Sequence, residues 1–145
     1  MPEQETLERA KEDEREGKAP STQAGEFVRE EIEHVREGKH GARSTKQAIA
    51  IGLSKARHAG VKLRAPKKGS QKTRKQAARD LRKGKSKSTK KSAKRSRATS
   101  RALKREGRSA ASKRALSRQA RSAAAKRSAA SRSRAAKKAA RTRKK

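Results

Sequence analysis

Residues 44–60 decide the fold, and they read Ser-Thr-Lys-Gln-Ala-Ile-Ala-Ile-Gly-Leu-Ser-Lys-Ala-Arg-His-Ala-Gly. Ser44 followed three residues later by Gln47 is a capping-box pattern, which is typical of the start of a helix. Gly60 supplies a residue type that commonly ends one. The stretch therefore predicts a helix that begins just after Ser44 and ends near Gly60.

The apolar residues of this stretch allow a second interpretation. Ile49, Leu53 and Ala56 fall on one face of a helix. Ile49, Ile51 and Leu53 also alternate at a period of two, as residues of a strand do. The serine cap and the helix-favouring residues that follow Leu53 support the helix over the strand.

The segment before this stretch has the same helical spacing, and its large apolar residues are Phe27, Val28, Ile32 and Val35. Gly38 follows as a C-cap. We therefore expect a helix-turn-helix-like hairpin over residues 21–66. Only nine large apolar side chains lie between residues 27 and 63, so we expect this hairpin to need a protein partner, a second copy or nucleic acid to become ordered.

Charge is sorted along the chain. Residues 1–37 hold 12 acidic and 6 basic residues, residues 38–66 hold 7 basic residues and no acid, and residues 67–145 hold 33 basic residues and two acids. The partition predicts three segments: an acidic helix (2–16) and linker over 1–20, the hairpin over 21–66, and a basic arm over 67–145.

The composition of the whole chain predicts little independent folding. Leu, Ile, Val and Phe number 13 of 145 residues, and the formal net charge is +32. A chain so poor in large apolar residues and so highly charged is typical of disorder. The predicted fold class is mainly α with extensive disorder: a short helical hairpin plus a long, conditionally helical basic arm, with no β-sheet.

The arm has low complexity, because Lys, Arg, Ala and Ser make up most of residues 67–145. Its composition favours helix, but repulsion between like charges opposes it. We expect an intrinsically disordered arm in which helices over 71–83 and 98–140 form once the charges are neutralised.

An excess of positive charge this large points to a polyanionic partner. A fully helical arm spans about 120 Å, and duplex DNA presents about 70 phosphates over that length. The sole aromatic residue is Phe27, so the stacking platforms typical of single-strand binders are missing. The candidate nucleic-acid-binding residues are Lys67, Lys68, Lys72, Arg74, Lys75, Arg79, Arg82, Lys83, Lys85, Lys87, Lys90, Lys91, Lys94, Arg95, Arg97, Arg101, Lys104, Arg105, Arg108, Lys113, Arg114, Arg118, Arg121, Lys126, Arg127, Arg132, Arg134, Lys137, Lys138, Arg141, Arg143, Lys144 and Lys145.

Other kinds of site find no support in the sequence. There is no Cys, and the three histidines, His34, His40 and His58, match no recognised ligand spacing. With two Asp residues and no Gly-rich phosphate loop, we expect no enzyme, no cofactor and no metal. No apolar run is long enough to span a membrane, and no secretory leader follows Met1.

Residues 28–66 resemble a small bacterial family of uncharacterised function. The resemblance lies in Ser44-Thr45-Lys46-Gln47-Ala48-Ile49-Ala50-Ile51-Gly52-Leu53-Ser54, which fits the family pattern Ser-x-Lys-Gln-Ala-Ile-Ala-Ile-Ala/Gly-Leu-Ser. It implies a bacterial source and brings no catalytic residues. Residues 67–145 are similar in composition to the Lys/Ala/Ser-rich tails of linker histones and bacterial histone-like proteins.

The sequence predicts a histone-like, nucleoid-associated protein of the bacterial cytoplasm that binds DNA without sequence preference and compacts it by neutralising phosphates. Two alternatives stay open. One is a cationic protein that binds RNA or the ribosome. The other is a protein-interaction or self-association module over 21–63, which a nucleic-acid-binding arm localises.

Overall fold

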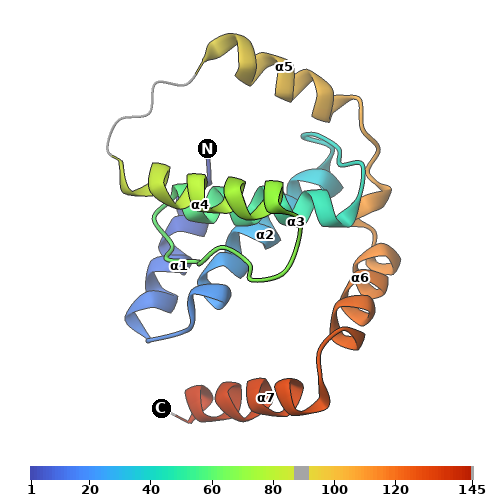
Figure 1. The fold of residues 1–145 in the computed structure, drawn as a ribbon. Helices are drawn as coiled ribbons and strands as arrows, with labels where there is room; N and C mark the ends of the chain where they lie inside the picture. The colour runs from blue at the N-terminus through green and yellow to red at the C-terminus, as the bar shows by residue number, and fades with distance from the viewer. Residues whose placement is uncertain (87–91, 145) are drawn as a thin grey trace.

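The computed structural model describes residues 1–86 and 92–144, which form seven α-helices and one short 3-10 helix and contain no strand (Figure 1). The elements are α1 (Gln4–Arg15), α2 (Pro20–Glu37), α3 (Thr45–His58), α4 (Gln71–Lys85), α5 (Ala93–Lys104), η1 (Ser109–Ala111), α6 (Lys113–Ala125) and α7 (Ala129–Arg143). The expectation of helices without a sheet is confirmed for this part of the chain. The expectation of extensive disorder is wrong.

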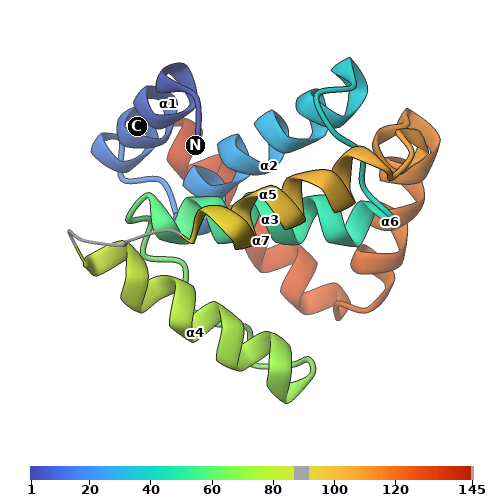
Figure 2. The same ribbon diagram turned by 90° about the horizontal axis from the view of Figure 1, so that it is seen from above.

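Helices α2 and α3 form the centre of the molecule (Figures 1 and 2). Gly38 ends α2 with a φ of 77°, which glycine adopts without a steric penalty. Ser44 caps α3, its Oγ accepting a hydrogen bond from the Gln47 N–H at 3.2 Å. Residues 49–53 are therefore helical, and the strand interpretation is excluded.

The two central helices approach each other closely at Gly52. A Cβ atom at this position would lie 2.6 Å from the Cα of Val28 on α2. Such a distance leaves no room for any side chain, so the crossing of α2 and α3 requires glycine there. This close contact brings the buried faces of both helices together.

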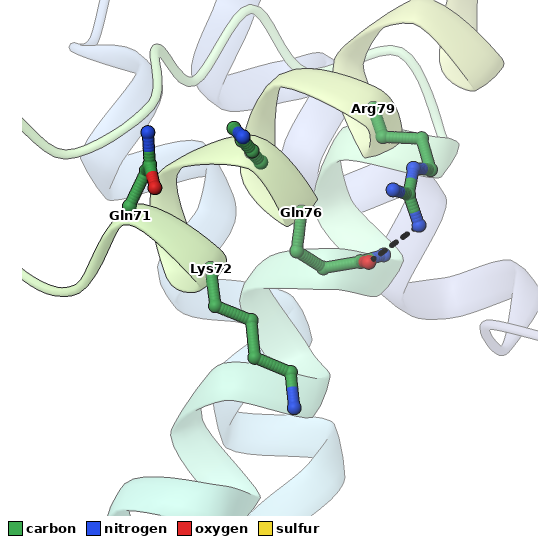
Figure 3. Close-up of a pocket in the computed structure, with 5 residues that line it drawn as sticks. Gln71, Lys72, Gln76 and Arg79 are labelled. Carbon is green, nitrogen blue, oxygen red and sulfur yellow. Dashed lines mark hydrogen bonds between the residues drawn. The ribbon is translucent and has the colours of Figure 1, made fainter.

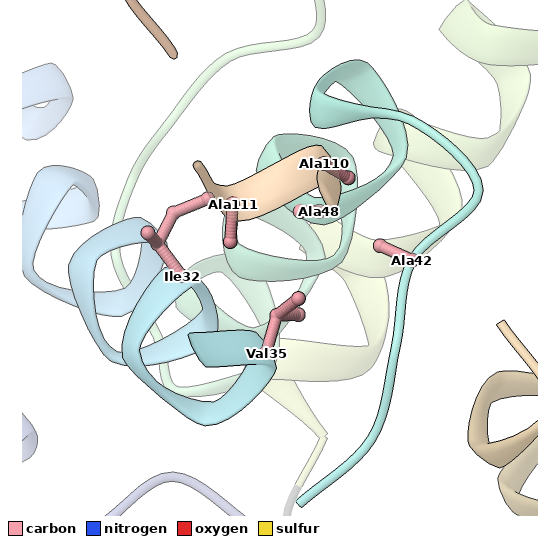
Figure 4. Close-up of a cluster of buried hydrophobic side chains, with 6 residues drawn as sticks. All are labelled: Ile32, Val35, Ala42, Ala48, Ala110 and Ala111. Carbon is pink, nitrogen blue, oxygen red and sulfur yellow. The ribbon is translucent and has the colours of Figure 1, made fainter. Parts of the chain in front are cut away.

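Two small apolar clusters make up the core. The first contains Ile32, Val35, Ala42, Ala48, Ala110 and Ala111 (Figure 4). The second contains Ala10, Ala24, Phe27, Ala56 and Val61. Each cluster draws on segments well beyond the α2–α3 hairpin, so the hairpin obtains the apolar surface it lacks from its own chain.

The basic region folds because its η1 segment packs into the first cluster. Ala110 and Ala111 are buried between α2 and α3, as Figure 4 shows. Hydrogen bonds to backbone carbonyls fix the same segment: Gly41 N–H to Leu103 O (2.9 Å), Ala42 N–H to Gly107 O (3.0 Å), Thr45 Oγ1 to Ala110 O (2.6 Å) and Arg36 Nε to Ala111 O (2.9 Å). The prediction of a disordered, low-complexity arm fails because alanine and backbone groups, rather than large apolar side chains, carry this contact.

Serine residues begin the helices of the basic region. In each case the hydroxyl accepts a hydrogen bond from the N–H three residues later, which satisfies a donor left free at the helix start. The pairs are Ser70 with Thr73, Ser92 with Arg95, Ser112 with Ala115 and Ser128 with Ser131. The predicted single helix over 98–140 is therefore divided among α5, α6 and α7.

Three further segments differ from the sequence-based expectations. The helix expected over 2–16 is α1, but Thr6 and Ala10 are buried against α2, so it is not an exposed helix. The linker expected within residues 1–20 is short, because α1 ends at Arg15 and Pro20 begins α2. The segment 71–83 is helical as part of α4, whose buried Ala77 faces α3, so packing on α3 supports this helix in addition to any neutralisation of its charges.

Two adjacent acidic residues are buried where α2 faces α3. Glu30 and Glu31 are 2% and 0% exposed. The Lys55 ammonium on α3 lies 3.4 Å from Glu30 Oε1 and 2.7 Å from Glu31 Oε2, so one cation serves both carboxylates. Burial raises the pKa of Glu30, but hydrogen bonds from the Glu3 N–H and the Thr6 hydroxyl, together with Lys55, outweigh it and hold that pKa below its ordinary value.

Replacing Gly41 tests the docking of the basic region. A Cβ here would lie 1.9 Å from the Glu106 carbonyl oxygen, so Gly41→Ala is expected to force the 103–107 segment away and to lower the free energy of unfolding by about 2 kcal/mol. Chemical denaturation followed by circular dichroism measures this change.

The matched control for Gly41→Ala is Gly25→Ala, because Gly25 is exposed in the interior of α2 with nothing near its Cβ position. Alanine at Gly25 is expected to stabilise the protein by about 0.5–1 kcal/mol through helix propensity. Equal effects at the two sites would contradict the docking seen here.

Removing the Lys55 charge tests the buried pair. Lys55→Met leaves Glu30 and Glu31 buried without a cation, and we expect a loss of about 3 kcal/mol in the free energy of unfolding. Lys46→Met, at an exposed position of the same helix, is the control and should change stability by less than about 0.5 kcal/mol. Urea titration of both variants gives the comparison.

Candidate nucleic-acid interface

The structure describes 29 of the 33 basic residues predicted to bind nucleic acid, and all 29 are exposed. The other four, Lys87, Lys90, Lys91 and Lys145, lie outside the described residues. The exposed residues are distributed over four helices and the turns between them. Folding has therefore left these side chains accessible from solvent.

These basic side chains keep their charge uncompensated. Within residues 67–86 and 92–144, none of them forms an ion pair with a carboxylate. Asp80, one of the two acids in this region, is buried and accepts hydrogen bonds from Ser54 and Gln76, both at 2.8 Å. Asp80 also lies 3.2 Å from His58 Nε2. The nearby acid thus serves the α3–α4 contact instead of neutralising the surface.

Most acids of the N-terminal part, residues 1–66, pair with basic residues of the same part. Arg9 bonds Glu26 at 2.7 Å and also contacts Glu5. Lys18 lies 2.8 Å from Asp13 and 2.6 Å from Glu16. The negative charges of α1–α3 are largely neutralised by ion pairs within that part, so the excess positive charge lies on α4–α7.

The basic helices differ in how much of their surface is free. On α4, one side packs against α3 through Ala77 and Asp80, and the basic residues occupy the exposed remainder. Helices α5 and α7 contain no buried residue. In Figure 1, α5, α6 and α7 follow one another as an arc around the α2–α3–α4 core, with α5 and α7 at opposite ends. The arc presents positive charge in several directions.

Two shallow surface hollows lie within this basic surface. The first is lined by Gln71, Lys72, Lys75, Gln76 and Arg79 on α4 (Figure 3). The second is lined by Arg114, Ser117, Arg118 and Arg121 on α6. Neither contains a carboxylate, so both offer only cationic and polar groups of the kinds that contact phosphate.

The length of a single helix sets the scale of a contact with DNA. Helix α7 has 15 residues, which corresponds to about 22 Å. A duplex carries about 13 phosphates over that length, and α7 brings six basic residues, namely Arg132, Arg134, Lys137, Lys138, Arg141 and Arg143. The number of basic residues on this one helix is therefore close to half the number of phosphates over the same length of duplex.

The sequence also contains signals of helix starts within the basic region. Each serine cap of the basic region precedes a run rich in Lys, Arg and Ala, and this pattern predicts helix starts inside a low-complexity segment. A second group was missed altogether. The structure brings Glu31, His34 and His40 together so that one donor atom of each lies within 4.8 Å of the others.

Residues 17–69, which include α2 and α3, match the model of a family of unknown function, DUF6496. No curated protein and no solved structure matches the chain. The resemblance to an uncharacterised family is thereby confirmed at that level, while the detailed motif and the histone-like character of the tail stay predictions.

The prediction about the membrane is confirmed for the described residues, because no helix among them is long and apolar enough to cross one.

Acid titration tests the pairing within the N-terminal part. Hydrogen bonds from His34 and Lys39 lower the pKa of Glu3 from 4.5 to about 2. A carboxyl whose pKa is lowered by folding stabilises the protein above its unfolded pKa and loses that effect as the pH falls. We therefore expect the melting temperature to drop between about pH 4.5 and pH 2.

The variant Glu3→Gln isolates the part of this drop that belongs to Glu3. It should lower the melting temperature at pH 6 and reduce the difference between pH 6 and pH 2. Melting curves recorded by circular dichroism at fixed ionic strength give both values. A variant with the full pH dependence of the parent would show that other carboxyls account for it.

Proposed function

We propose that the protein binds duplex DNA without sequence preference, neutralises its phosphates and compacts it. The observation that carries the proposal is the set of 29 exposed basic side chains without carboxylate partners on residues 67–86 and 92–144. Surfaces of this kind bind nucleic acid by displacing condensed counterions from phosphates. An inert, solubilising surface would not need this degree of segregation from the acids.

The arrangement of the basic helices supports compaction over simple coating. Helices α5 and α7 lie at opposite ends of the arc formed with α6 (Figure 1), so a straight duplex held against one does not follow the other. Two duplex segments, or one bent segment, can contact both helices at once. Bridging and bending of this kind bring DNA segments together.

The composition of the exposed helices supports binding without sequence preference. Helices α5 and α7 contain neither Asn nor Gln, the residues that pair with adenine in the major groove. Phe27, the sole aromatic residue, is 1% exposed, so it offers no stacking platform for unpaired bases. The first fact removes adenine readout by amide side chains from these two helices, and the second favours a duplex over single strands.

A protein–protein role for residues 21–63 has less support. Among the described residues, the large hydrophobic side chain that stays exposed is Met1. The apolar faces of α2 and α3 are covered by α1, α4 and η1. A surface without an apolar patch is poorly suited to stable protein docking.

Salt dependence is the most direct test of the mechanism. If about ten phosphates are contacted, the logarithm of the binding constant falls with the logarithm of salt concentration at a slope near −9. Fluorescence anisotropy with a labelled 30-base-pair duplex measures this slope. A slope shallower than about −3 for the full chain would contradict binding through counterion release.

Two matched variants locate the interface, each replacing six exposed basic residues with Gln. The test variant changes Arg132, Arg134, Lys137, Lys138, Arg141 and Arg143 on α7, and the control changes Lys11, Arg15, Arg43, Lys46, Lys62 and Arg64. The two proteins have the same net charge. The α7 variant is expected to bind at least tenfold more weakly, with a slope shallower by about 1 for each lost contact, and the control variant to stay within about threefold of the parent.

Competition decides between DNA and RNA. Duplex DNA should displace the labelled duplex at least as well as ribosomal RNA at equal phosphate concentration and physiological salt. In the cell, chromatin immunoprecipitation should give uniform occupancy of the genome, which would place the protein in the nucleoid. Stronger competition by RNA, or discrete peaks of occupancy, would overturn the proposal.

A further inference from the structure

We infer that Glu31, His34 and His40 form a binding site for a divalent transition-metal ion, with Zn²⁺ as the best match. One donor atom from each residue lies within 4.8 Å of the other two. Two histidines and one glutamate form a donor set that binds zinc in proteins. The site is independent of the basic surface, and it lies where α2 ends and the turn before α3 begins.

Glu31 is the first reason for the inference. Its side chain is 1% exposed, with Oε1 3.1 Å from His40 Nε2 and Oε2 2.7 Å from the Lys55 ammonium. Both contacts are at ion-pair distance, but no partner of either carboxylate oxygen meets hydrogen-bond geometry. A buried carboxylate requires strong compensation, which a cation at Oε1 would supply while Lys55 stays at Oε2.

The protonation of His40 gives the second reason. Its Nδ1 lies 3.0 Å from the carbonyl oxygen of Gly41, and a carbonyl accepts hydrogen bonds, so Nδ1 is the donor nitrogen and Nε2 is the nitrogen that carries the lone pair whenever the ring is neutral. The lone pair of Nε2 then faces a carboxylate oxygen at 3.1 Å. Two acceptors at this distance need a cation between them, which is either a proton on Nε2 or a metal ion that both groups bind.

The spacing of the two acceptors fits ligands of one ion. Zinc binds nitrogen and oxygen at about 2.0–2.2 Å, which puts two ligands of a tetrahedral ion about 3.4 Å apart. The observed 3.1 Å is close to that separation. The hydrogen bond from the other ring nitrogen to a backbone carbonyl is the usual way in which a metal-binding histidine is oriented.

His34 completes the set. Its Nε2 lies 2.9 Å from Glu3 Oε1, so a proton on Nε2 donates to that carboxylate, and Nδ1, which lies 4.0 Å from Glu30 Oε1, is the nitrogen left to coordinate. The two rings meet edge to face, with their centroids 6.1 Å apart. The side chains of His34 and His40 are 12% and 17% exposed, which leaves a path by which water can occupy a fourth position.

The charges around the cluster also favour a cation. Lys39 and Lys55 contact the carboxylates of Glu3, Glu30, Glu31 and Glu37, so four negative groups face two positive ones. The chain as a whole is strongly cationic, with a net charge of +32. That charge repels metal ions elsewhere on the surface, which makes any tight binding informative.

Calorimetric titration of the full chain with ZnCl₂ tests the site. We expect one ion per chain, with binding weakened at least a hundredfold in His34→Gln and His40→Gln. The control is His58→Gln, because His58 pairs with Asp80 away from the cluster, and it should stay within threefold of the parent. Absence of saturable binding, or equal binding by His40→Gln and the parent, would overturn the inference.

A measurement on the unaltered protein covers the case in which a variant fails to fold. Long-range nitrogen–proton spectra report the imidazole nitrogens of the three histidines, and the His58→Gln spectrum assigns one set. Zn²⁺ is expected to shift the resonances of His34 and His40 and to leave those of His58 in place. Equal shifts of all three, or no shift, would overturn the site as well.

Discussion

The Lys55 ammonium, held between two buried glutamates, is the interaction on which the rest of the fold depends. Glu30 and Glu31 are adjacent on α2, and Lys55 on α3 pairs with both. A buried carboxylate without a partner is costly, so the pairing fixes how α2 and α3 face each other. The same two glutamates also contact segments outside α2 and α3. Glu30 accepts the Glu3 N–H at 3.1 Å at the start of α1, and Glu31 contacts His40 in the turn on which the 103–107 segment docks.

This dependence explains how a chain with so few large apolar residues becomes ordered. Each alanine of η1 buries little surface, but it sits beside backbone groups that form hydrogen bonds at close range, and Gly41 and Gly52 allow the backbones to approach. Small residues and backbone contacts leave the long Lys and Arg side chains free. The sequence can therefore have a folded basic region and an accessible cationic surface at the same time.

The hairpin was predictable because its signals are local. Gly38 and Ser44 mark helix ends through their own conformation and hydroxyl group, and both act as expected. The burial of Ala110 and Ala111 was not predictable, since nothing in the sequence distinguishes them from the other 25 alanines. His34 and His40 come together only because the turn after Gly38 reverses the chain. Contacts between residues far apart in the chain exist only once it is folded, so local sequence patterns do not predict them. The serine caps, in contrast, are local patterns that do predict helix starts.

The separation of charge in space has a consequence for how DNA and folding would influence each other. Positive charges concentrated on α4–α7 repel one another and oppose the compact state. The acids of α1–α3 form their own ion pairs and do not reduce this repulsion, whereas a bound polyanion would reduce it. The unfolded chain carries the same 46 basic residues and would also bind DNA under the proposed mechanism, and a ligand that binds both states stabilises only by the difference in affinity. Any rise in melting temperature on adding duplex therefore measures what the helical arrangement contributes beyond charge alone. It separates a surface shaped by the fold from a mere accumulation of lysine and arginine.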